Sequence, residues 1–304
     1  SSINDNNFTV SLSETTDGGM TISSSFMLLN EAGGGSSDED AGFSLAFTDG
    51  SKLDVLNAGN ASGSHDISIP GSAGAEGVTV TTGNTAPTGL DFMTGSTVYG
   101  VEYHSAADFL ADGLKMSFSA STDNGAASGA TYGMDNHFAF GGTYVTDLGD
   151  SAVTVGFGYS DSDGAKTGTQ MTADEGGVHV GVSAVTGDLT VAVGFADGDS
   201  IESTGTATND VQTDGEVVKA GIKYVSGDLT FNVGVASGTA QDSATAGTAG
   251  TTEDSKDVVS ASVSYAVASG VTAILGYTDV DSSDEGENDT TDGSAWYIGA
   301  NMAF

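Results

Sequence analysis

The feature that most constrains the fold is a hairpin unit that recurs along the second half of the chain. Strand-like segments begin near residues 136, 174, 214, 255 and 293, at nearly constant spacing. Apolar residues occupy every second position in them. In 151–161, for example, Val153, Val155 and Phe157 alternate with small or polar residues. Because side chains alternate across a strand, the pattern predicts strands with one apolar face and one polar face.

The connections between these segments alternate between two kinds. One kind is a tight turn, such as Asp49-Gly50, Thr186-Gly187 or Ser226-Gly227, and Asp-Gly is a strong hairpin signal. The other kind is a longer loop rich in Asp, Ser, Thr and Gly. Tight turns at one end of the strands and long loops at the other are typical of an outer-membrane β-barrel. A Greek-key sandwich has no reason to sort its loops in this way.

The same alternation, read along the whole chain, gives fifteen strands of an all-β, antiparallel transmembrane barrel. The last of them, 293–304, places Trp296, Ile298, Ala300, Met302 and Phe304 on one face and ends on the terminal Phe, as last strands of such barrels do. Closed bacterial barrels have an even number of strands. We therefore expect a sixteenth strand, either missing upstream of Ser1 or too degenerate to recognise. No apolar run is long enough for a transmembrane helix, which needs about 18 residues.

The charge of the chain narrows the choice of partners. The chain has forty-two acidic residues and six Lys, but no Arg and no Cys, and its formal net charge is −36. This composition argues against nucleic acid, whose phosphates require basic residues, and excludes disulfides and thiolate metal sites. Two readings of the acidity stay open: solubility in a salty medium, or a surface that attracts cations.

Over essentially its whole length, the chain resembles the general diffusion porins of alpha-proteobacteria, of the Rhodobacter type. The most specific pieces are FTVSLSETTDGGMTISSSF and GFSLAFTDGSKLDVLNAG, in which a Lys-bearing strand precedes a long loop. The resemblance implies one porin barrel over 1–304 in the cell outer membrane, surrounded by lipid and lipopolysaccharide and assembled as a homotrimer. It further implies that 58–95 is the third external loop, folded into the lumen as a constriction. The function it implies is a passive, water-filled channel for small hydrophilic solutes.

One departure from that family concerns the constriction, which usually carries a cluster of Arg opposite acidic residues. This chain has no Arg, and strand alternation instead puts several Lys and acids on the lumen side. The candidate constriction residues are Lys52, Asp54, Glu102, Lys115, Lys219 and Lys223 on strands, and Asp66, Glu76 and Asp91 on the long loop. For each there is a plainer alternative, a charged side chain avoiding the apolar face or a solvated loop carboxylate. The acid excess predicts a preference for cations.

Other residues of the lumen side receive simpler interpretations. Gly156, Gly158, Gly181 and Gly194 keep that face small, which leaves room in the lumen. A single His without a partner at ligand spacing, such as His104 or His179, is expected to be a polar wall residue. No catalytic or phosphate-binding motif is present, so an enzyme is not expected.

The acidic run 279–292 is the one candidate for metal binding. Asp279 and Asp281 fit the start of an EF-hand loop, but Asp284 replaces its Gly and Thr290 replaces its final Glu. The motif therefore fails. We expect no tightly bound cofactor, only loosely bound calcium or magnesium at Asp279, Asp281 and Asp284.

A secreted or surface-layer all-β protein with acidic calcium-binding loops is the alternative function. It would bury the apolar faces in a core. The positions of the tyrosines favour the barrel, because they lie at strand ends on the apolar side, as in the aromatic girdles of outer-membrane proteins. These tyrosines are Tyr144, Tyr159, Tyr224, Tyr265 and Tyr277.

Overall fold

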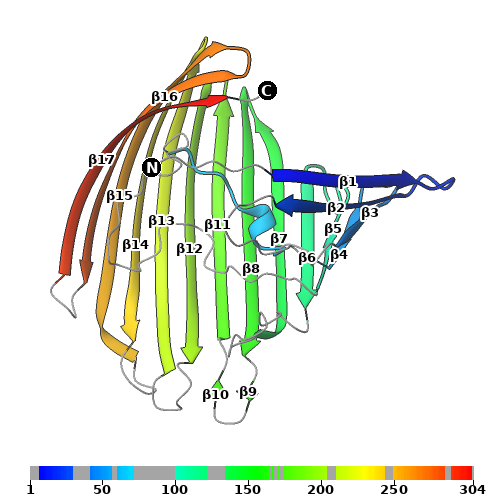
Figure 1. Cartoon of the computed structure of the whole chain (residues 1–304), viewed down its shortest axis with the longest axis horizontal. Helices are drawn as coiled ribbons and strands as arrows, with labels where there is room; N and C mark the ends of the chain where they lie inside the picture. The colour runs from blue at the N-terminus through cyan, green and yellow to red at the C-terminus, as the bar shows by residue number, and fades with distance from the viewer. Residues whose placement is uncertain are drawn as a thin grey trace.

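The alternating segments form strands of one antiparallel sheet, which confirms the predicted fold class. The computed structural model describes residues 7–29, 42–56, 60–71, 100–121, 134–164, 166–167, 170–171, 174–203, 210–243, 249–284 and 289–302. The sheet contains fifteen strands, and each pairs with its neighbours in chain order (Figure 1). A separate two-stranded hairpin, β9 (Lys166–Thr167) and β10 (Gln170–Met171), stands between β8 and β11.

The strands of the main sheet have the following bounds: β1 (Asn7–Thr15), β2 (Thr21–Leu29), β3 (Phe43–Ala46), β4 (Lys52–Val55), β5 (Val101–His104), β6 (Leu114–Ser121), β7 (Met134–Leu148), β8 (Ser151–Gly164), β11 (Asp174–Thr186), β12 (Leu189–Ser203), β13 (Asp210–Ser226), β14 (Leu229–Ser243), β15 (Ala249–Ala268), β16 (Val271–Asp284) and β17 (Asp289–Met302). A 3-10 helix, η1 (Gly63–His65), lies between β4 and β5 in the chain. From β7 onward the strands are longer than predicted, because pairing continues into segments expected to be loops.

The predicted tight turns join consecutive strands. Gly50, between β3 and β4, has a φ of 87°, and Gly187, between β11 and β12, has a φ of 56°. This left-handed conformation is strained for residues with a side chain and suits Gly. The turn chemistry therefore sets the hairpin register, and with it the face on which each side chain lies.

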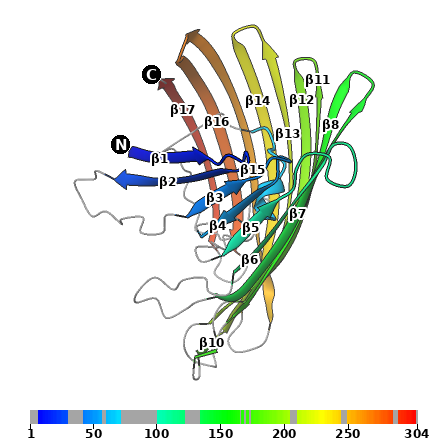
Figure 2. The ribbon, with the colours of Figure 1, turned by 90° about the vertical axis from the view of Figure 1, so that its right-hand side faces the viewer.

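The sheet is strongly curved, and its two edge strands are β1 and β17 (Figure 2). Both edges lie on the same side of the curved sheet in that view, and within the described residues they do not pair with each other. The expected sixteenth strand would stand between them, and it stays a prediction.

One face of the sheet is apolar and exposed. Val193, Ile222 and Val233 on consecutive strands are 49%, 49% and 50% exposed, and Trp296 and Ile298 on β17 reach 71% and 86%. The buried apolar cluster on the other face contains, among the described residues, only Ala196 and Val217, with Ile69 packed against them. A soluble sandwich would bury its apolar face, whereas an apolar exposed face of this extent indicates contact with lipid or with another protein surface.

Of the five tyrosines predicted at strand ends, Tyr224 and Tyr265 lie on this apolar face near the ends of β13 and β15, whereas Tyr159 and Tyr277 lie in the middle of β8 and β16, because these strands are longer than predicted. Tyr224 and Tyr265 are both 47% exposed, close to the tight turns. Tyr277 packs on Trp296, with ring centroids 4.7 Å apart. Within the described part of the chain, no helix has the length and apolar character needed to cross a membrane.

Candidate functional site

Residues 60–71, the described part of the predicted long loop, lie against the polar face of the sheet. They cross from β7 to β14 over a row of wall glycines. A Cβ built on Gly141 would lie 2.6 Å from the carbonyl oxygen of Ala61, and one on Gly181 would lie 2.7 Å from the Cβ of Ile67. The sequence suggested that these glycines leave this part of the lumen open. Instead, the absence of side chains at these positions makes the space that the loop segment fills.

Hydrogen bonds of residues 61–64 attach the segment to three strands. The backbone N–H of Ala61 donates to Ser119 Oγ at 3.0 Å, and Ser64 Oγ donates to Glu102 Oε1 at 2.8 Å. His179 Nε2 donates to the carbonyl oxygen of Ser62 at 2.9 Å. These contacts fix the segment to β5, β6 and β11 by groups that water cannot easily replace, since the residues involved are largely buried.

His65, at the end of η1, makes the central contact of the segment. Its Nδ1 lies 2.6 Å from Thr143 Oγ1 and its Nε2 lies 2.8 Å from Ser117 Oγ. Burial lowers the pKa of His65 to about 4, and the proximity of His104, His179 and Lys115 acts in the same direction. His65 is therefore neutral at pH 7 and holds the segment as an uncharged, hydrogen-bonded group.

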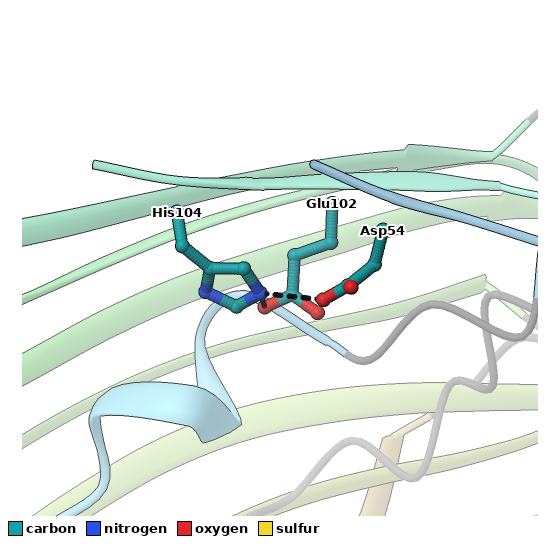
Figure 3. A group of neighbouring side chains, drawn as sticks. All are labelled: Asp54, Glu102 and His104. Carbon is teal, nitrogen blue, oxygen red and sulfur yellow. Dashed lines mark hydrogen bonds and ion pairs between the residues drawn. The ribbon is translucent and has the colours of Figure 1, made fainter. Parts of the chain in front are cut away.

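Beside this segment, a charged cluster is formed by β4 and β5. The two strands pair so that Lys52 stands opposite His104, and Asp54 stands opposite Glu102. Figure 3 shows the side chains of Asp54, Glu102 and His104 extending from these strands toward one another, on the side where η1 lies. His104 Nε2 is 3.0 Å from Asp54 Oδ2 and 3.6 Å from Glu102 Oε1, and Lys52 Nζ is 2.7 Å from Asp54 Oδ2.

The cluster is only partly open to water. The Glu102 side chain is 2% exposed and that of Asp54 is 15% exposed, whereas Lys52 is 43% exposed. Ser44 Oγ donates to Asp54 Oδ1. Buried carboxylates interact with nearby charges more strongly than solvated ones, so the charges within this cluster interact strongly with one another.

The remaining candidate lysines lie on the same face but farther along the sheet. Lys115 on β6 and Lys219 on β13 belong to one row of paired residues, which passes through Thr143, Gly156, Gly181 and Gly194. Lys223 stands opposite Asn232, nearer the tight turns. The structure therefore brings Lys52, Asp54 and Glu102 together, keeps Lys115 on the adjacent strand β6 near His65, and sets Lys219 and Lys223 apart.

The three predicted loop acids have different outcomes. Asp66 follows η1 and, with Lys219, borders a hollow of about 330 Å³ that is also lined by residues 67–69. Glu76 and Asp91 lie outside the described residues. The role of Asp66 and the strand residues in a constriction stays a prediction.

The described parts of the acidic run, 279–284 and 289–292, belong to the paired strands β16 and β17. Asp281 pairs with Asp292, and Asp284 pairs with Asp289. Asp279 and Asp281 share a strand face with Tyr277, whose hydroxyl donates to Asp279 Oδ1 at 3.0 Å. The side chain of Asp284 lies outside the described part. The expectation of loosely bound calcium or magnesium here stays a prediction.

Sequence reasoning missed the role of histidine in this site. His104, expected to be a wall residue without partners, is paired with two carboxylates, and His65 received no role at all. The signal was present in the spacing: Lys52 and Asp54, like Glu102 and His104, are two residues apart and so share a face. Joining the two pairs required knowing that β4 and β5 are neighbours, although a long loop separates them in the chain.

Comparison with known proteins gives one family and a consistent fold. A family model described as Gram-negative porin matches residues 1–285. Among solved structures, the chain is similar to the trimer form of OmpT, an outer membrane protein of Vibrio cholerae, with 13% identity, 97% of this chain and 90% of that chain covered, and a TM-score of 0.62. No curated protein matches the chain.

Two further solved structures are porins. An anion-selective porin from Comamonas acidovorans has 12% identity, with 99% of this chain and 90% of that chain covered and a TM-score of 0.60. A mutant of the Rh. blastica porin has 16% identity, with 98% of this chain and 89% of that chain covered and a TM-score of 0.57. At these identities the likeness shows a shared fold.

Proposed function

The chain belongs to the Gram-negative porin family, and from this premise we propose that it forms a passive, water-filled channel for small hydrophilic solutes. The family match confirms the resemblance and makes the protein an outer-membrane porin. The observation that carries the finer proposal is the division of the sheet into two faces. One is apolar and exposed, and the other is polar and bears the docked segment 60–71.

We place the constriction of this channel where segment 60–71 approaches β4 and β5. There Ser64 reaches Glu102, and the cluster of Lys52, Asp54 and Glu102 lies beside the segment. Asp66 and Lys219 border the hollow farther along the segment. A solute passing this point meets fixed charges and hydroxyl groups, which sort solutes by charge and size without any chemical step. We expect no catalytic activity.

We expect a preference for cations from the acid excess of the chain, whose formal net charge is −36. Near the segment, Lys52 is ion-paired with Asp54 and Lys219 borders the same hollow as Asp66, whereas Glu102 adds a negative charge. The similar fold of an anion-selective porin means that the fold does not decide selectivity. At about 0.15 M salt, charges act over roughly 8 Å. The preference should therefore be modest at high salt and should grow as salt is lowered.

Reversal potentials across a KCl gradient test this proposal. The parent protein should show a potential of the sign expected for K⁺ permeation, and Glu102→Gln should reduce it. Asp188→Asn, which removes a carboxylate at a tight turn, is the matched control and should leave the potential unchanged. A reversal potential of the opposite sign in the parent protein would contradict the cation preference.

Passage of hydrophilic solutes is tested by swelling of liposomes that contain the protein. Swelling rates should fall as the size of an uncharged sugar rises, and should show no saturation with sugar concentration. Saturation would indicate a binding site for the sugar and would contradict passive diffusion.

For its partners, we propose a homotrimer with outer-membrane lipid and lipopolysaccharide around the exposed apolar face. Support comes from the size of that face and from the trimer form of the OmpT structure. Light scattering of the protein in detergent, corrected for bound detergent, should give three times the chain mass of 30.1 kDa.

A further inference from the structure

We propose that Asp54, Glu102 and His104 form a binding site for one divalent transition-metal ion, such as Zn²⁺, on the polar face of the sheet. Among the described residues they form a group of metal-ligating side chains whose ligand atoms all lie within 4.8 Å of one another. The binding itself does not depend on the proposed channel. Its effect on conductance does.

The distances suit a common ion. A zinc ligand lies about 2.0–2.2 Å from the metal, so two ligands at an angle of about 90–110° are roughly 3.0–3.5 Å apart. His104 Nε2 is 3.0 Å from Asp54 Oδ2 and 3.6 Å from Glu102 Oε1. The three ligand atoms lie within 4.8 Å of one another, so side-chain rotations can bring them to one metal without breaking the backbone pairing of β4 and β5.

The ligand types select the class of metal. One imidazole with two carboxylates is a donor set for zinc and its neighbours in the first transition series, whereas calcium and magnesium favour oxygen ligands throughout. Three protein ligands leave a coordination position for water, as in open zinc sites. A carboxylate cluster without the histidine would not make this distinction.

Each ligand is also held by a second partner. His104 Nδ1 lies 2.9 Å from Ser117 Oγ, so the ring is oriented with Nε2 toward the carboxylates. Ser64 Oγ donates to Glu102 Oε1, and Ser44 Oγ donates to Asp54 Oδ1. Such partners of metal ligands fix ring orientation and raise metal affinity, and all three ligands here have one.

Lys52 competes with the metal for the carboxylate of Asp54. Its Nζ lies 2.7 Å from Asp54 Oδ2, the same oxygen that faces His104. Because the Lys52 side chain is 43% exposed, it can swing away from Asp54 when an ion enters. Removing this positive charge should therefore tighten metal binding, an effect that a merely structural cluster would not show.

The test uses the untagged protein, folded in detergent and checked by its heat-dependent gel migration. Calorimetric titration with Zn²⁺ should show one ion per chain, and Co²⁺ should give the visible absorption of a bound ion. His104→Gln should weaken binding at least tenfold. His137→Gln changes a buried histidine that contacts Ser162 outside the cluster and should bind as the parent does. An equal concentration of Ca²⁺ or Mg²⁺ should not displace Zn²⁺.

Lys52→Gln gives a second readout, which holds even if His104→Gln fails to fold: its affinity for Zn²⁺ should rise several-fold. Absence of Zn²⁺ binding to the folded parent, parent-like binding by folded His104→Gln, or weaker binding by Lys52→Gln would overturn the site. In bilayers, Zn²⁺ should lower the conductance of the parent but not of His104→Gln. Binding in calorimetry without any conductance would uphold the site and contradict the proposed channel.

Discussion

Gly234 on β14 lies directly beneath Pro70 of the loop segment: a Cβ built on Gly234 would be 2.6 Å from the carbonyl oxygen of Pro70. A Cβ built on Gly221, on the neighbouring strand, would come even closer to the same oxygen. Because backbone atoms are involved on the loop side, no side-chain rotation relieves the clash. The presence of glycine at these two wall positions is therefore tied to the position of segment 60–71.

Substitution Gly234→Val should displace the segment from the wall. Overpacking of this kind costs about 1–3 kcal/mol, and if the segment narrows the pore, single-channel conductance should rise. The control is Gly299→Val on the polar face of β17, where a Cβ would meet nothing within 4 Å. Equal conductance in the two folded variants and the parent would mean that the segment does not limit ion flow.

Docking of segment 60–71 should depend on pH through His65. The pKa of His65 is lowered from its ordinary value of 6.5 to about 4, chiefly by burial, and then by His104, His179 and Lys115. The released segment therefore binds a proton that the docked segment does not bind. Docking should be fully favourable above pH 6.5 and should weaken as pH falls from 6.5 toward 4.

Hydrogen exchange of residues 60–71 between pH 5 and 7.5, corrected for intrinsic rates, measures this dependence. Protection should fall toward pH 5 in the parent. In His65→Gln, which cannot titrate, protection should be lower throughout and flatter with pH. An unchanged slope in His65→Gln would assign the pH dependence to another group.

A charged side chain on the apolar face should destabilise the folded protein where the strands are embedded in lipid. On β12, outward residues are apolar from Leu189 to Phe195 and acidic at Asp197, so Val193 lies within the apolar band. Val193→Arg should destabilise the folded protein by roughly 2–4 kcal/mol. Ser183→Arg, on the polar face of β11, is the matched control and should cost much less. The free energy of unfolding is measured with urea for the protein folded in lipid vesicles. An equal loss of this free energy in the two variants would contradict the assignment of the two faces.

The fold was predictable because its signals are local. The alternation Val153, Val155, Phe157 and the Asp49-Gly50 turn depend on neighbouring residues only, and the structure confirms the strands and the hairpin they predicted. Strand ends were less accurate. Pairing between β12 and β13 continues to Ser203 and Asp210, since polar residues extend these strands beyond the apolar band that marked them in the sequence.

The candidate site was predictable only in part, because its contacts join distant segments. Strand alternation placed Lys52, Asp54 and Glu102 on the polar face, and the pairing of β4 with β5 agrees with that placement. The partners of His104 and the packing of Gly181 against Ile67 depend on which strands and loops meet in space. No pattern within one strand contains that information.

Recording single channels in planar lipid bilayers tests the central claim most directly. The folded protein should insert and produce discrete conductance steps that scale with salt concentration, follow a nearly linear current–voltage relation at low voltage and require no ligand. Protein that shows heat-dependent gel migration and inserts into the bilayer, yet carries no current, would contradict the account of this chain as an open diffusion channel.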